Sequence, residues 1–208
     1  WSLNGSVLPA ETTSSLMPSV GGTYSVLVVN NITGCENTDT AIVNESSPPT
    51  ITAAVVSNVF ATNHIVDVTA VGLGVYEYSL GNGSWQNSNV FENVSLGIHT
   101  VTVRDINGCG IATTSVLVID YPLFFTPNGD GYHDTWNIVG IATQPGAVIY
   151  IFDRFGKLLK QLSPTGNGWN GTYNGVVLPT NDYWFLIEYN EPIDGKRKEF
   201  KAHFTLKR

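Results

Sequence analysis

Residues 125–134, FTPNGDGYHD, decide how the last part of this chain folds. Pro127 fixes its own φ angle and favours extended backbone at the residue before it. Gly129 and Gly131 permit positive φ, so the backbone can turn back on itself within a few residues. The stretch also separates two parts of unlike composition, which makes it the entrance to a C-terminal domain.

Oxygen-bearing groups recur through the same loop. Asn128, Asp130 and Asp134 offer side-chain oxygens, and the Tyr132 carbonyl lies between them in sequence. Ca²⁺ prefers such oxygens, although the glycines do not follow the spacing of an EF-hand. The alternative is a glycine-rich turn in which the Asx side chains accept hydrogen bonds from the loop's own amides. The sequence leaves both interpretations open, and Ca²⁺ is the one cofactor that it suggests.

Four motifs, in order, resemble the gliding-motility-associated C-terminal domain, which is the type B cargo domain of the type IX secretion system. The FTPNGDG loop is followed by IYIFDRFGK at 149–157, by GWNG at 168–171, and by LP at 178–179 ahead of a tyrosine. The likeness covers residues 121–208. The matching positions are Phe125, Pro127, Asn128, Gly129, Asp130, Gly131, Asp134, Arg154, Gly156, Trp169, Gly171 and Tyr183.

This resemblance implies a function in protein export. Residues 121–208 would be the signal that the outer-membrane type IX translocon recognises, together with an outer-membrane protein of the PorP/SprF type. The protein would be exported to the cell surface or the medium. Because the shared motifs are turns and core residues, we expect the translocon to recognise a folded surface. The chain begins at Trp1 and carries no signal peptide, so we expect it to be the C-terminal piece of a longer adhesin or gliding-motility protein.

The charged residues are distributed unevenly. Residues 1–120 carry nine acidic side chains and one basic one, whereas residues 121–208 carry eight acidic and nine basic ones. No basic stripe has the size that phosphate backbones require, which excludes nucleic acid as a partner. Exposed charges contribute little to stability, so several basic residues near the C-terminal end are predicted to be free to contact a protein partner. They are Lys196, Lys198, Lys201, Lys207 and Arg208.

Catalytic motifs are absent from the sequence. It contains no nucleophile elbow, zinc-protease motif or phosphate-binding loop, and no histidine stands at metal-ligand or triad spacing. No run approaches the ~18 apolar residues of a membrane-spanning helix. We therefore predict a protein that is not an enzyme and has no small-molecule substrate.

A repeat connects the first part of the chain with the middle. Gly22–Val26 with Gly34 and Cys35 matches Gly97–Val101 with Gly108 and Cys109, at an offset of 74–75 residues. Both copies continue into segments that alternate polar and apolar residues, which indicates half-buried strands. The repeat resembles the closing strands of Ig-like or PKD-like modules of bacterial surface proteins. Cysteines in separate modules are too far apart to pair, so we predict buried free thiols.

The sequence therefore predicts an all-β chain of tandem Ig-like sandwich modules. Residues 1–47 form a partial or compact module, residues 49–120 a complete one, and residues 121–208 a C-terminal β-sandwich. A Ser-Ser-Pro-Pro segment at 46–49 serves as a linker, because Pro-Pro is extended and cannot join a strand ladder. We expect the last domain to fold alone, and residues 183–187 to be a central strand covered on both sides. Its predicted strands are 147–152, 158–162, 183–189 and 199–206. In the last strand the even-numbered residues, Phe204 and Leu206 among them, are predicted to face inward, and Gly156 is predicted to take a left-handed conformation in a hairpin turn.

A rival function remains open at this point. A carbohydrate-binding or adhesive module would use an exposed tryptophan as a sugar platform, since aromatic faces pack on apolar surfaces. Trp85 and the loop around Asp130 are the candidates. In small sandwiches tryptophan usually fills the core, and we expect this of Trp169 and Trp184.

Overall fold

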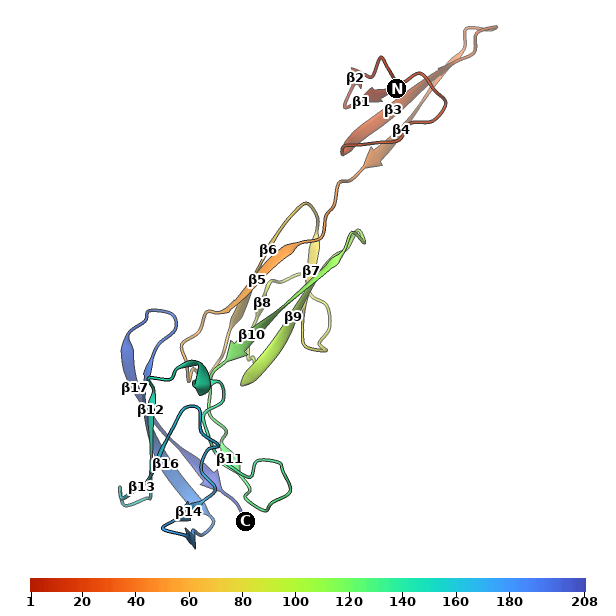
Figure 1. The fold of residues 1–208 in the computed structure, drawn as a ribbon. Coiled ribbons are helices and arrows are strands. Elements are labelled where there is room, and N and C mark those ends of the chain that lie inside the picture. Colours follow the sequence, from red (N-terminus) through yellow and green to blue (C-terminus); the bar gives the residue numbers. More distant parts are fainter.

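The computed structural model describes residues 1–208 and shows three all-β bodies along an elongated chain (Figure 1). The first body is a single antiparallel sheet of order β2-β1-β3-β4. Its strands are β1 (Ser2–Leu3), β2 (Ser6–Val7), β3 (Gly22–Val29) and β4 (Glu36–Val43). Tyr24, at 5% exposure, is the one buried side chain of these strands. The first body is therefore a β-hairpin with a short flap, without a second sheet.

The second body is a sandwich of two three-stranded sheets. One sheet contains β5 (Thr50–Val55), β6 (Val66–Val71) and β8 (Val90–Phe91), and the other contains β7 (Tyr76–Leu80), β9 (Gly97–Asp105) and β10 (Ile111–Val118). Seven valines fill the space between the sheets. The sequence repeat corresponds to the β3–β4 hairpin in the first body and the β9–β10 hairpin in the second. The covering sheet of β5, β6 and β8 is what the first body lacks.

The third body is a five-stranded sheet of order β11-β17-β16-β12-β13. Its strands are β11 (Phe124–Phe125), β12 (Val148–Phe152), β13 (Leu158–Leu162), β16 (Asn181–Asn190) and β17 (Arg197–Leu206). A hairpin of β14 (Thr172–Tyr173) and β15 (Val176–Val177), a 3-10 turn at Ile141–Thr143 and irregular segments accompany the sheet. The prediction of an all-β chain is confirmed. The second layer of the last domain is built largely from loops.

The inner face of this sheet carries an aromatic core. Alternation along β17 turns Phe204 (1% exposed) and Leu206 (0%) inward, as the sequence predicts. Trp136 stacks on Phe204 with ring centroids 3.8 Å apart. Strand β16 is central, between β17 and β12, but the prediction that it is covered on both sides is wrong. Its outward-facing Trp184 is 40% exposed.

The core of the last domain extends into the second body. Phe60, which follows β5, is 9% exposed and belongs to the same cluster as the sheet's aromatic residues. Its ring stacks on Phe200 at 4.5 Å and meets Tyr189 edge-on at 5.2 Å. The second and third bodies thus share packed side chains. The division at residues 47–49 and 120–121 stays a prediction.

The predicted linker at 46–49 lies against the second body. The Ser47 amide donates to the Leu73 carbonyl at 2.6 Å, and the Ser46 hydroxyl donates to the Asp105 carboxylate. The linker is therefore fastened to the second body.

Both cysteines are free, and both are exposed. The prediction that they are buried is wrong. Each lies in the loop that joins the two strands of its hairpin, β3–β4 or β9–β10, where no second layer covers the side chain. No helix of the structure has the length and apolar character needed to cross a membrane.

Candidate functional site

The loop after β11 is held together by its own side chains. Asp134 accepts hydrogen bonds from the Gly129 amide (2.6 Å) and the Gly131 amide (2.8 Å), one on each carboxylate oxygen. Asp130 accepts bonds from the Tyr132 amide (2.7 Å) and the Asn128 side chain (2.9 Å). These bonds, that from Tyr132 first, lower the pKa of Asp130. The loop is thus a set of Asx turns.

The same contacts bear on the predicted calcium ligands Asn128, Asp130, Tyr132 and Asp134. The carboxylate oxygens accept bonds from donors inside the loop. No group of three or more His, Cys, Asp or Glu side chains gathers in the structure as a metal site would. The geometry matches the Asx-turn interpretation, and calcium binding stays a prediction.

Several residues singled out by the resemblance lie in the core. Phe125 and Trp169 are 1% exposed, and Tyr183 is 4% exposed. Trp169 packs edge-on against Tyr183 with centroids 5.0 Å apart, and its indole N–H donates to the Thr172 carbonyl at 2.9 Å. Gly171 has a φ of 77°, and a Cβ there would collide with Leu206. These positions therefore set the fold and cannot touch a partner directly.

The other motif residues lie at the surface. Asn128, Gly129, Asp130, Gly131, Arg154 and Gly156 are exposed, and Pro127 and Asp134 are half-buried. They form two turns, one after β11 and one between β12 and β13. A partner can contact these two turns.

Arg208 ties the end of the chain to three motif segments. Its guanidinium donates to the carbonyls of Leu178 (3.0 Å), Gly171 (3.3 Å) and Pro127 (3.4 Å). A planar fork of donors suits this task, and an ammonium would not reproduce it. The expectation that Arg208 is free is therefore wrong, because segments far apart in sequence converge on it.

The predicted contact lysines differ in their surroundings. Lys198 lies 3.5 Å from the buried carboxylate of Glu191 and 3.6 Å from Asp194, so it too is occupied. The Lys207 ammonium sits 4.1 Å above the ring of Phe124. The remaining two, Lys196 and Lys201, are exposed and make no ion pair. Lys196 and Lys201 keep the freedom that a contact residue needs.

The turn between β12 and β13 is preorganised. Asp153 Oδ1 accepts the amides of Phe155 and Lys157, both at 2.9 Å. Gly156 has a φ of 79°, which confirms the predicted left-handed glycine. The Arg154 guanidinium stacks 4.7 Å from the ring of Phe155, which is 80% exposed. The turn therefore displays an exposed cation and an exposed aromatic ring that contact each other.

A groove of about 410 Å³ runs beside this turn on the outer face of the sheet. The strand register places Phe152 opposite Trp184, and Leu186 opposite Lys201. The prediction that Trp184 fills the core is wrong, because alternation turns it outward while its two neighbours in β16 face inward. We call this feature the outer groove. It is lined by Phe152, Asp153, Arg154, Gly156, Trp184, Phe185, Leu186 and Lys201.

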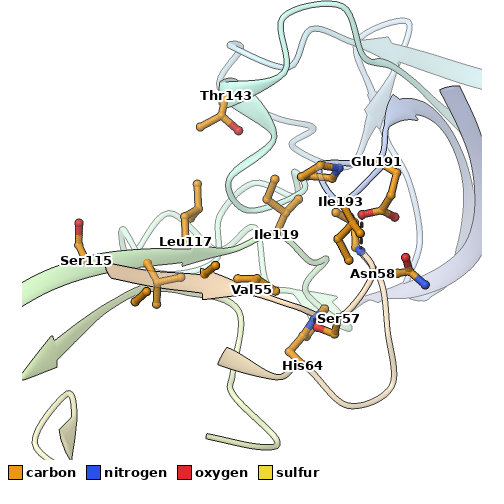
Figure 2. A pocket seen from close by; sticks show the side chains of 15 residues that line it. Val55, Ser57, Asn58, His64, Ser115, Leu117, Ile119, Thr143, Glu191 and Ile193 are labelled. Atoms are coloured by element: carbon orange, nitrogen blue, oxygen red, sulfur yellow. Dashed lines mark hydrogen bonds between the residues drawn. The ribbon is translucent and has the colours of Figure 1, made fainter. Parts of the chain in front are cut away.

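A second hollow, of about 470 Å³, lies at the junction of the second and third bodies. Figure 2 shows Ser57 and His64 on one side of it and Glu191 with Ile193 on another. His64 is 5% exposed, and its Nε2 lies 2.9 Å from Asp120, while its Nδ1 lies 3.3 Å from the Ser57 hydroxyl. Sequence reasoning missed this cluster, since 63 residues separate its ends.

The order of contacts in this cluster differs from that of a serine hydrolase. There Nε2 faces the serine and Nδ1 faces the aspartate, whereas here the two ring nitrogens are exchanged. The Ser57 hydroxyl also accepts the Ile65 amide at 3.1 Å. The cluster connects the loop after β5 to the segment that enters the last domain. Its geometry therefore suits a structural contact between the second and third bodies.

Glu191 completes the junction. It is fully buried, and its carboxylate accepts the Val59 amide at 3.3 Å and lies 3.5 Å from Lys198. The Tyr189 hydroxyl donates to it at 3.5 Å. Burial, followed by the nearby Glu191 charge, raises the pKa of Tyr189 to about 12. This group is a paired, buried carboxylate that holds the two bodies together.

Trp85, the candidate sugar platform, is partly covered. The Arg104 guanidinium lies 4.1 Å from the centre of its ring, and Arg104 also pairs with Glu77 at 2.7 Å. One face of the indole is therefore occupied by the chain itself.

Comparisons with known structures reach only weak similarity. A dimeric latent PorU from Porphyromonas gingivalis aligns with a TM-score of 0.27 at 15% identity, over 89% of this chain and 24% of that one. The Drosophila OTK extracellular domains 3–5 align with a TM-score of 0.28 at 16% identity, over 93% and 74%. Titin domains A168–A170 align with a TM-score of 0.27 at 14% identity, over 90% and 75%. Scores of this size say nothing about what the chain does.

The comparison with curated protein sequences gave no match. One protein family does match. Residues 119–206 fit the family described as the CHU_C type IX secretion signal domain. The matched range begins just before β11 and ends with the last residue of β17, so it coincides with the third body. It contains both surface turns and the aromatic core that fixes them. The third body of this chain is therefore a type IX secretion signal domain of the CHU_C family.

Proposed function

We propose that this chain is the C-terminal part of a longer cell-surface protein whose last domain directs export through the type IX secretion system. The family match over residues 119–206 carries the proposal. The upstream bodies form a stalk of the adhesin or gliding-motility kind. The chain is not an enzyme, and it acts by presenting a folded surface.

The folded surface has a physical basis in the motif residues. Trp169 and Tyr183 are buried, so they act only by shaping what lies outside them. The exposed turns at 128–131 and 153–157 are each closed by an aspartate that accepts two amide or side-chain donors. The two turns are held in a fixed position relative to each other only in the folded domain, because they follow different strands of its sheet. A partner that contacts them recognises the fold.

The recognising partner in this proposal is the outer-membrane translocon with a protein of the PorP/SprF type. Among the predicted contact residues, Lys196 and Lys201 are the two that are exposed and make neither an ion pair nor a contact with an aromatic ring. Association between a basic surface and an acidic one is steered by charge and weakens as salt screens it. Export by this route delivers the protein to the cell surface or the medium.

A fusion experiment tests the proposal. Residues 49–208, placed behind a signal peptide and a reporter in a bacterium with a type IX system, should bring the reporter to the cell surface. Trp169→Ala removes a buried ring and should cost ~3–5 kcal/mol, which abolishes export by unfolding the signal. A reporter that stays in the periplasm with the intact signal contradicts the proposal. Full export of an unfolded Trp169→Ala variant would show that a linear motif suffices.

A further inference from the structure

We propose that the outer groove is the docking site for an extended, acidic and apolar segment of the outer-membrane partner. The inference rests on the proposed function, because the partner belongs to the export machinery. The groove lies on the face of the sheet opposite the aromatic core, next to the turn at 153–157. Its floor comes from β12 and β16, and its walls come from that turn and from β17.

The floor of the groove is apolar and open. Trp184 is 40% exposed, and Phe152 stands opposite it across the strand pair. Leu186 is the next outward residue of β16 and stands opposite Tyr150. Tryptophan and arginine are the residues most enriched among those that dominate binding energy at protein interfaces. An exposed indole set between apolar neighbours, with an arginine at the rim, matches that composition.

The rim of the groove is positively charged. Arg154 and Lys201 are both exposed and carry no ion pair. The one acidic lining residue is Asp153, whose Oδ1 already accepts the amides of Phe155 and Lys157. Two cations thus face an occupant from opposite walls. The complementary occupant carries carboxylates.

This chemistry favours a peptide over a sugar. Sugar hydroxyls are both donors and acceptors, so a sugar site supplies both kinds of group. The two cations of this groove, Arg154 and Lys201, are donors only, and Asp153 Oδ1 is taken by the amides of its own turn. Carboxylates are acceptors only and match such a rim. An extended peptide presents alternate side chains on one face. One face can therefore place a leucine-like side chain on Trp184 and glutamates beside Arg154 and Lys201.

Two variants disturb the groove without touching the core, namely Trp184→Ala and Lys201→Glu. Lys160→Glu is the matched control, since Lys160 is an exposed lysine of β13 that does not line the groove. Lys201→Glu and Lys160→Glu should melt like the wild type, because these side chains are exposed. Trp184 is 40% exposed, so Trp184→Ala is compared with the wild type at a temperature where its melt shows it to be fully folded. In the reporter fusion we expect export to fail for the two groove variants and to stay normal for the control. Normal export of stably folded groove variants, or equal loss in the control, overturns the inference while leaving the export function intact.

A binding measurement separates the inference from the export function. The purified chain is titrated with a synthetic peptide in which leucine and glutamate alternate at every second position, with serine between them. The wild type should bind it, and Trp184→Ala should weaken the binding about thirtyfold, the effect of losing one dominant contact. Heparin serves as the anionic-glycan probe. Binding of heparin without the peptide, or binding that survives Trp184→Ala, overturns the inference even where the fusion is exported.

Discussion

Phe60 offers the sharpest test of how the last domain is held. It belongs to the second body by sequence, yet its ring is 9% exposed and stacks on Phe200 of β17. Replacing it with alanine removes a buried aromatic side chain, which costs ~3–5 kcal/mol. For a unit of this size each kcal/mol moves the melting temperature by about 2–4 °C. The Phe60→Ala variant should therefore melt roughly 6–20 °C lower than the wild type.

The backbone conformation at Phe60 predicts which of two substitutions is the more stable. Its φ is 62°, in the left-handed region that side chains with a Cβ disfavour by ~1–2 kcal/mol. Alanine keeps that strain, whereas glycine relieves it. Phe60→Gly should thus be at least as stable as Phe60→Ala, the reverse of the usual order in regular structure.

Calorimetry on residues 49–208 measures both expectations. The wild type should show one transition, because the second and third bodies share Phe60 and the His64–Asp120 contact. Phe60→Ala should lower it or split it in two. Two separate transitions in the wild type, or an unchanged melt in Phe60→Ala, would refute the shared core and favour a last domain that folds alone. Early proteolysis at 120–123 would point the same way.

Four further outcomes are expected. Gly171→Ala should cost more than Gly156→Ala in urea melts, because both glycines have positive φ but only Gly171 has Leu206 where the Cβ would go; equal costs would contradict this packing. Arg208→Glu should lower the melting temperature while Lys201→Glu should not, because Arg208 holds three carbonyls; matching melts would show that the carbonyl contacts contribute nothing. Hydrogen bonds lower the pKa of Asp130 below 3.8, so its stabilisation is present above that pH and is lost as the pH falls through the lowered value. The difference in melting temperature between the wild type and Asp130→Asn should therefore disappear in acid. Melting temperatures in calcium and in chelator should coincide, and a melting temperature raised by calcium would favour the cation-binding loop. The pKa of Tyr189 is raised from 10.0 to about 12, so its stabilisation is complete below pH 10 and is lost as the pH rises from 10 to 12. Over that range Tyr189→Phe should lose less stability than the wild type. Parallel curves of stability against pH for the two proteins would argue against the buried pair with Glu191.

Local patterns predict much of this fold. Alternation of apolar and polar residues locates β12, β13, β16 and β17 to within about two residues, because one buried face is enough to specify a strand. Gly156 marks its turn since only the left-handed conformation fits there. The repeat marks equivalent hairpins, because Gly22 and Gly97 each begin the first strand of one.

Contacts between distant segments do not follow from such patterns. In the sequence, Arg208 is indistinguishable from other charged surface residues. Only the fold brings the carbonyls of Pro127, Gly171 and Leu178 to its guanidinium. Trp184 reads as core because β16 is apolar on both alternations. Which face receives the second layer depends on where the segments after β11 and β13 pack, and no local rule decides that.

The position of Phe60 affects how the export signal is delimited. A fusion that begins at 119 contains every motif residue but lacks Phe60, the His64–Asp120 contact and the Val59 amide bond to Glu191. Glu191 is fully buried, and a buried carboxylate that loses a partner is costly. The shorter fusion therefore tests stability and recognition together. The 119–208 and 49–208 fusions are compared under conditions in which the same fraction of each is folded, so that stability and recognition are separated. Export that depends only on the folded fraction shows that the second body acts by stabilising the fold. Export that differs at equal folded fraction reports on a contact made by the second body itself.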